Sequence, residues 1–215
     1  MLKIGMLTSG GDCQGLNAAL RGVAKTLYNE LGDKVTIYGI RDGYRGLIEG
    51  DYHEMLPEDF SDILTVGGTI LGTSRQPFKE MRKTIEDSEE TKLDKMLHTV
   101  KKAGFDCLVI LGGNGTHKTA NLLSEHGIPV VTLPKTIDND LVLTDHTPGF
   151  GSAASMLPPP SARSSSTPPS ISRDPSPSSR SWAATQDGSP LLPGLQENMR
   201  ATTHALSTSR RLRSP

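Results

Sequence analysis

A repeated order of aliphatic run, glycine-rich turn and amphipathic stretch constrains the fold of this chain more than any other feature. The aliphatic run at 2–7 leads into a turn at 8–12, and residues 16–31 then carry apolar side chains at helical spacing. Because strands covered on both faces read as continuous aliphatic runs, the order predicts an α/β fold with a three-layer, doubly wound, parallel-rich sheet. Further strands are expected at 33–40, 107–111 and 128–133, and further helices at 92–103 and 118–126.

Three polar turns follow the expected strands. We call 8–12 the first turn, 112–116 the second turn and 134–140 the third turn. Residues 41–50 are expected to form a glycine-rich loop without regular structure. Because ligands of doubly wound sheets bind outside the carboxyl ends of strands, the three turns predict one shared site.

The pattern of a folded protein stops near residue 156. Residues 157–215 contain 14 Ser, 10 Pro and 7 Arg, no Lys and only three acidic residues. Such a segment cannot bury enough apolar surface to offset the entropy lost on ordering. We therefore expect one domain over 1–155, followed by a disordered tail over 156–215.

Charge and cysteine content narrow the function classes. The formal net charge of −1 argues against nucleic acid or a membrane as the main partner and favours small molecules. Cys13 and Cys107 have neither metal-ligand spacing nor the density of a disulfide framework. The N-terminal apolar run is too short for a signal peptide, and no stretch approaches the roughly 20 apolar residues that span a bilayer. We expect a cytoplasmic protein.

The first and second turns place consecutive glycines between a strand and a helix. Unhindered backbone N–H groups at the start of a helix can bind a phosphate group. The alternative is that the glycines serve only the dihedral angles of tight turns. In either case, Thr116 is expected to cap the helix that follows the second turn.

The third turn combines charged and hydroxyl groups. Asp138 offers a carboxylate for proton abstraction, Asp140 a second one for a metal ion, and Lys135 a cation for phosphate charge. These are the groups that phosphoryl transfer requires. The alternative is a solvated acidic turn that Thr136 and Asp138 cap locally.

Four stretches, in this order, resemble one family. SGGDCQGLNAALRG (9–22), GGTILGTSR (67–75), GGNGT (112–116) and PKTIDND (134–140) are similar to 6-phosphofructokinases, which phosphorylate fructose 6-phosphate on its 1-hydroxyl. The resemblance covers residues 1 to about 155, roughly the first half of a family chain. It implies ATP and fructose 6-phosphate as substrates and an enzyme of glycolysis.

The resemblance also implies a phosphoryl-donor site. Gly11 would line this site, and Arg75 would reach the donor phosphates. The second turn would supply the other contacts, from Gly113, Asn114, Gly115 and Thr116.

Two positions bear on the identity of the donor, and they conflict. Gly115 resembles the small residue that leaves room for the α-phosphate of a nucleotide, whereas Lys135 resembles the lysine of pyrophosphate-using relatives. Because steric exclusion is a stricter filter than one additional cation, we expect ATP. Pyrophosphate is the alternative.

The third turn would hold the catalytic groups and Mg²⁺. Asp138 would act as general base, Lys135 would neutralise charge, and Thr136, Asp138 and Asp140 would contact the sugar. Asn114 stands where ATP-using relatives usually have an Asp that acts on the Mg²⁺ shell. A neutral amide is a poorer partner for a hard cation, so metal placement would fall more heavily on Asp138 and Asp140.

Part of the tail, read in another frame, resembles a family motif that the chain otherwise lacks. For residues 179–196, a permitted choice of codons encodes E-V-M-G-R-D-A-G-W in an alternate frame, a family motif that helps bind the sugar phosphate. We infer, as a hypothesis, a frameshift near 155–160 in the gene or in its sequencing. The alternative is an authentic disordered Ser/Pro tail.

The chain as written is expected to have little or no kinase activity and to be poorly soluble, because the domain would expose an apolar face. The family's homo-oligomer is not expected to form properly. Arg21 lies where bacterial relatives have an effector-site arginine, and it is equally compatible with a surface helix. Two other classes are a non-catalytic nucleotide-binding fragment and a relative of lipid or NAD kinases, which lack the PKTIDND turn.

Overall fold

A computed structural model describes residues 1–85, 90–142 and 144–156 of the chain. The tail predicted from residue 156 onward therefore lies, apart from its first residue, outside the described residues. The last described helix ends at Met156. The domain over 1–155 stays a prediction. No helix in the described ranges is long and apolar enough to cross a membrane.

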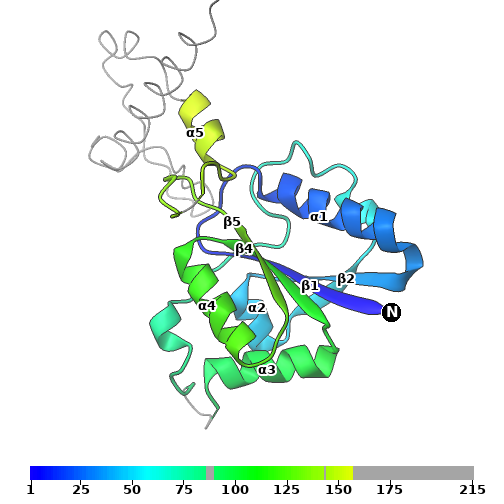
Figure 1. Ribbon diagram of the computed structural model, residues 1–215, viewed down its shortest axis with the longest axis vertical. Helices are drawn as coiled ribbons and strands as arrows, with labels where there is room; N and C mark the ends of the chain where they lie inside the picture. Colours follow the sequence, from blue (N-terminus) through cyan, green and yellow to red (C-terminus); the bar gives the residue numbers. More distant parts are fainter. Residues whose placement is uncertain (86–89, 143, 157–215) are drawn as a thin grey trace, which may run out of the picture.

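A five-stranded sheet forms the centre of the molecule, with the order β3-β2-β1-β4-β5. The chain first builds outward from β1 to β2 and β3, then returns across β1 to β4 and β5 (Figure 1). All neighbouring strands are parallel except β3, which pairs antiparallel with β2. This arrangement confirms the predicted doubly wound, parallel-rich sheet. The strands are β1 (Leu2–Ser9), β2 (Val35–Ile40), β3 (Tyr52–Met55), β4 (Cys107–Gly112) and β5 (Val130–Pro134).

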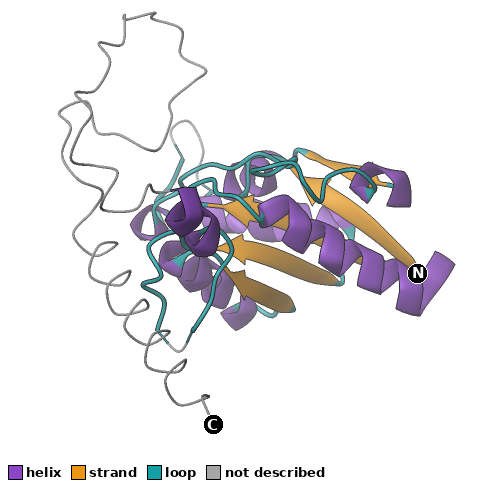
Figure 2. Cartoon of the chain, turned by 90° about the horizontal axis from the view of Figure 1, so that it is seen from above, coloured by secondary structure: helices purple, strands orange, loops and turns teal. Residues whose placement is uncertain are grey.

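Helices cover both faces of the sheet (Figures 1 and 2). One face packs against α1, and the other packs against α2, α3 and α4. The three layers of the prediction are thus present. The helices are α1 (Leu16–Leu31), α2 (Tyr44–Glu49), α3 (Lys92–Ala103), α4 (Asn114–Glu125) and α5 (Phe150–Met156), with short 3-10 turns η1 (Gly32–Lys34), η2 (Pro57–Phe60) and η3 (Phe78–Glu80).

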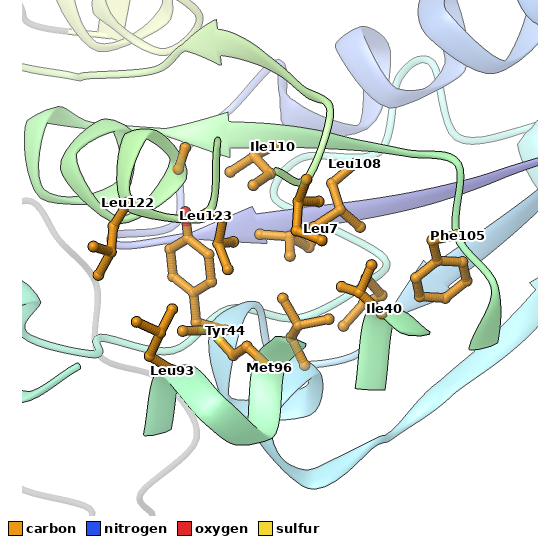
Figure 3. Packing of buried hydrophobic residues seen from close by; sticks show 14 of the residues in the cluster. Leu7, Ile40, Tyr44, Leu93, Met96, Phe105, Leu108, Ile110, Leu122 and Leu123 are labelled. Carbon is orange, nitrogen blue, oxygen red and sulfur yellow. The ribbon is translucent and has the colours of Figure 1, made fainter. Parts of the chain in front are cut away.

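Each face of the sheet has its own apolar core, because side chains alternate along every strand. Leu7 and Met6 show this directly, since these neighbours on β1 belong to different clusters. The cluster beneath α2, α3 and α4 is shown in Figure 3 and includes Leu7, Ile40, Tyr44, Met96, Leu108, Ile110 and Leu123. The cluster beneath α1 includes Met6, Leu16, Leu20, Ile37, Val109 and Leu111.

Local sequence signals explain why α3 has the bounds that were predicted. The Thr91 hydroxyl accepts a hydrogen bond from the Asp94 N–H at 3.1 Å, and Asp94 accepts one from the Thr91 N–H at 3.0 Å. This reciprocal pair is a capping box, which fixes the first turn of a helix. Gly104, with φ of 70°, ends the helix in the left-handed conformation that glycine favours.

Two local predictions were wrong, and one strand was missed. Residues 41–50 are not an irregular loop, because they contain α2. The antiparallel strand β3 was not predicted. The helix expected at 118–126 begins four residues earlier, at Asn114, since the second turn itself provides its first turn.

Candidate functional site

The three turns lie side by side at the carboxyl edge of the sheet. In the strand register, Ser9 pairs with Gly112, and Gly112 pairs with Pro134, so β1, β4 and β5 end at the same level. The chain changes its winding direction between β1 and β4, and this is the place where doubly wound sheets bind ligands. The predicted convergence of the turns is confirmed.

Lys135 joins the third turn to the other two. Its backbone N–H donates to the Gly112 carbonyl at 2.9 Å, and its ammonium donates to the Gly11 carbonyl. The side chain is buried. Burial lowers the pKa of Lys135, and the charge of Arg75 acts in the same direction. The charges of Lys135 and Arg75 therefore lie close enough to interact.

The segment 67–75 brings Arg75 to this region. The Gly10 N–H donates to the Ser74 carbonyl at 3.2 Å, and the Thr73 hydroxyl donates to the Gly10 carbonyl at 2.9 Å. The Ser74 hydroxyl in turn donates to the Asp42 carbonyl at 2.5 Å. These bonds fix the segment against the first turn immediately before Arg75.

The second turn opens α4 without a side-chain cap. Gly113 is the N-cap residue, and no side-chain hydrogen bond caps this helix within the described ranges. The prediction that Thr116 caps it was wrong, because the buried Thr116 hydroxyl donates instead to the Ser9 carbonyl at 3.3 Å. Uncapped N–H groups at a helix start attract anions.

Gly115 faces open space, whereas Gly112, three residues earlier in the chain, does not. A Cβ added to Gly115 would meet no described atom within 4 Å, but one added to Gly112 would lie 2.5 Å from the Thr116 hydroxyl. Gly112 is therefore required for packing. Gly115 leaves a space in front of the first turn of α4.

Hydrogen bonds within the third turn give it a fixed shape. The Asp138 N–H donates to the Thr136 hydroxyl at 3.1 Å, and that hydroxyl donates to an Asp140 carboxylate oxygen at 2.8 Å. The Thr147 hydroxyl donates to the Thr136 carbonyl at 2.6 Å. The local capping by Thr136 that was considered from the sequence is thus present. It orients the Asp140 carboxylate and fixes the backbone at Asp138, and it does not exclude a catalytic role for either residue.

Asp138 has the environment of a proton acceptor. Burial raises the pKa of Asp138 above its usual value, and the neighbouring Asp140 charge adds to this effect, while Lys135 opposes it. A raised pKa makes a carboxylate a stronger base. The structure therefore distinguishes Asp138 from the more exposed Asp140, for which the sequence alone gave no reason.

The donor set at the third turn is compatible with Mg²⁺. The described residues contain no group of three or more His, Cys, Asp or Glu side chains that could hold a metal by themselves. Magnesium commonly uses one or two carboxylates and takes its other ligands from water and phosphate oxygens. The repulsion between Asp138 and Asp140 is relieved by a cation, so this pair fits such a site.

Two of the predicted residues lie outside the third turn in the sequence, on α4 and α1. Asn114 is exposed in the first turn of α4. Arg21 lies on α1, where its Nε donates to the Ser61 carbonyl at 3.4 Å. This contact does not test whether Arg21 belongs to an effector site or is a surface residue of the helix.

Sequence reasoning missed Tyr44. This side chain is 1% exposed, lies in the core of Figure 3, and donates its hydroxyl hydrogen bond to the Thr116 carbonyl at 2.8 Å. Just before Tyr44, Gly43 lets the chain pass close to β1, because a Cβ there would lie 2.5 Å from the Thr8 carbonyl oxygen. The only signal in the sequence is an aromatic residue between glycines, which does not specify a contact with α4.

The comparisons with known proteins agree with this geometry. The sequence pattern of the family described as phosphofructokinase matches residues 3–172. This chain belongs to the phosphofructokinase family. An ATP-dependent 6-phosphofructokinase of Spirochaeta thermophila is 54% identical over 154 residues, which are 71% of this chain and 42% of that relative. The chain thus spans less than half the length of this relative.

Solved phosphofructokinases share the fold. The enzyme of Pichia pastoris in the T-state has a TM-score of 0.61 and 30% identity, with 71% of this chain and 17% of that chain covered. A pyrophosphate-dependent phosphofructokinase from Nitrosospira multiformis has a TM-score of 0.58 and 25% identity, with 71% and 38% covered. The family therefore includes relatives named for either phosphoryl donor.

Proposed function

We propose that this chain carries the donor-binding and catalytic turns of a 6-phosphofructokinase, which transfers a phosphoryl group from ATP to the 1-hydroxyl of fructose 6-phosphate in the cytoplasm. The observation that carries the proposal is the meeting of the three turns at the switch point of the sheet, where Lys135 bridges to Gly11. Family membership supplies the reaction class.

Each turn has a part in this reaction. The N–H groups at the start of α4 and the turn at Gly11 bind the donor phosphates, while Arg75 and Lys135 offset their charge. Asp138 accepts the proton of the attacking hydroxyl, as its raised pKa favours. The hydrogen bonds of Thr136 hold Asp138 in position for this transfer.

Mg²⁺ would be held by Asp138 and Asp140, and it would neutralise charge on the donor phosphates. The Asp140 oxygen that accepts from Thr136 keeps this second carboxylate beside the first. Asn114 would contribute at most through water, because a neutral amide binds a hard cation less well than a carboxylate does.

The space in front of Gly115 supports ATP as the donor. A nucleotide carries a phosphate and a nucleoside beyond the two phosphates of pyrophosphate, and an added Cβ at Gly115 would point into unfilled space. The Lys135 ammonium donates to the Gly11 carbonyl, so its charge lies at the first turn and would act on the phosphates of either donor. This steric room supports ATP as the donor.

A substitution at Gly115 tests the donor site. In calorimetric titrations, Gly115→Asp is expected to weaken ATP binding by at least tenfold, because it fills the space and adds a negative charge. Gly22→Asp is the matched control, since Gly22 also lies in a helix and its added Cβ would meet no described atom within 4 Å. Equal ATP affinities of the two variants would contradict the proposed donor site.

A second candidate function is donor binding without turnover. A coupled assay with fructose 6-phosphate separates the two candidates, because binding without turnover supports the second and robust turnover supports the first. Absence of ATP binding would contradict both.

A further inference from the structure

A groove between α2 and α3 is lined by none of the residues assigned to the donor and catalytic turns. Its volume is about 670 Å³, which lies within the usual range of small-molecule sites, about 300–1,000 Å³. Its walls come from α2, from Tyr52 at the start of β3, from one face of α3 and from Gln76, Ile85 and Glu90 between β3 and α3. The groove is therefore a separate candidate site.

Positive charge is concentrated in this groove, although the whole chain has a formal net charge of −1. Among the described residues that line the groove, two carboxylates face a larger number of cations. The cations are Arg45, Lys92, Lys95 and Lys102, and the carboxylates are Glu49 and Glu90.

Two of these cations are already engaged. The Arg45 Nε donates to a Glu49 carboxylate oxygen at 3.0 Å. The Lys92 ammonium donates to Gln76 at 3.0 Å and to Glu80 at 3.2 Å. Lys95 and Lys102 form no ion pair within the part of the chain that the structure describes. These two lysines are the cations that remain for a ligand.

The spacing of the two lysines indicates the shape of that ligand. Residues 92, 95, 99 and 102 recur on one face of α3, so both lysines face the same groove. Seven residues of α-helix rise about 10 Å, which separates Lys95 from Lys102 along the axis. An elongated anion with charge at both ends fits this separation better than a single phosphate ion.

The groove also has an apolar side. Ile48 and Tyr52 contribute to its lining. The Tyr52 ring packs edge-on against Phe105, with centroids 5.2 Å apart, and is held in place by this contact. Thr99 is buried beside Gly50, where an added Cβ would lie 3.8 Å from the Thr99 hydroxyl. This side can contact the body of an organic ligand.

We propose that this groove binds an organic bisphosphate, with one phosphate at Lys95, the other at Lys102, and the body of the ligand against Ile48 and Tyr52. The positive charge of the lysines attracts the anion over a long range and so speeds its association with the groove. The apolar side discriminates an organic bisphosphate from inorganic anions.

Calorimetric titration of the 215-residue protein with glucose 1,6-bisphosphate tests the proposal. The bisphosphate is expected to bind at one site, and glucose 6-phosphate at least tenfold more weakly. Lys95→Gln together with Lys102→Gln is expected to weaken bisphosphate binding at least tenfold. Lys25→Gln together with Lys34→Gln removes two exposed lysines from α1 and η1 and is expected to leave the affinity unchanged.

Three outcomes would overturn the proposal: no bisphosphate binding by the unaltered protein, an unchanged affinity in the Lys95/Lys102 variant, or an equal loss in the Lys25/Lys34 control. If the first double variant fails to fold by circular dichroism, the charge-retaining pair Lys95→Arg and Lys102→Arg takes its place. That pair must then retain bisphosphate binding within about threefold, and loss of binding by a folded arginine pair also overturns the proposal.

Discussion

The hydrogen bond from the Tyr44 hydroxyl to the Thr116 carbonyl links the core to the first turn of α4. Its length is 2.8 Å, and the tyrosine is 1% exposed. Tyr44→Phe removes the donor and keeps the ring, so the packing of the core is preserved. We predict that this variant loses both stability and ATP affinity.

The expected magnitude follows from the burial of this bond. An intramolecular hydrogen bond contributes about 1 kcal/mol net. The Thr116 carbonyl lies within α4 and keeps its intrahelical bond, so the loss is expected to stay near this value. For a protein of this size, each kcal/mol lowers the melting temperature by roughly 2–4 °C. If the bond contributes about 1 kcal/mol to holding the donor-binding turn in its binding conformation, its loss lowers ATP affinity by roughly fivefold.

A matched tyrosine separates positioning from general stability. The Tyr28 hydroxyl also donates to a backbone carbonyl, that of Met55, at 2.7 Å, but Tyr28 packs with the cluster on the α1 face of the sheet. Tyr28→Phe is expected to lower the melting temperature without changing ATP affinity.

Thermal melts by circular dichroism and ATP titration by calorimetry measure the two effects. The reasoning is refuted if Tyr44→Phe binds ATP as tightly as the unaltered protein, or if Tyr28→Phe loses affinity equally. The first result would make Tyr44 a purely structural residue. The second would show that a global loss of stability explains the change.

Two further predictions address the third turn and the tail. Because the pKa of Asp138 is raised in the folded state, its charge destabilises the fold above that pKa, and Asp138→Asn is expected to raise the melting temperature at pH 7. This gain should shrink as the pH falls through the folded pKa toward 3.8, and a gain that stays constant with pH would argue against the shift. For the tail, we predict that the gene across codons 150–200 encodes the E-V-M-G-R-D-A-G-W motif in an alternate frame. DNA sequencing decides this, since an alternate frame without the motif excludes the frameshift.

The elements that the sequence predicted well are those with long, regular patterns. The bounds of α1 and α3 agree with the helical spacing at 16–31 and 92–103, and the capping box at Thr91 reinforces the second of these. The strands β1 and β4 were found because continuous aliphatic runs suit a sheet that is covered on both faces. In these segments, local preference and tertiary packing favour the same structure.

The short elements depended on contacts with distant residues. Helix α2 has six residues, which is too few for a periodic pattern and too few for an isolated helix to be stable. It is held by contacts with α3, since Tyr44 and Leu47 lie in the same buried cluster as Met96. Such a contact cannot be read from neighbouring residues.

The sequence by itself determined which chemical groups the site contains and that they follow strand ends: the glycines of the first two turns, Lys135, and the carboxylates of the third turn. Only the tertiary structure decided their arrangement. The register of β1, β4 and β5 aligns the turns, burial distinguishes Asp138 from Asp140, and Thr116 bonds to Ser9 instead of capping its helix. The physical reason is that helix and strand preferences act over a few residues, whereas strand register, burial and pKa depend on segments far apart in the chain.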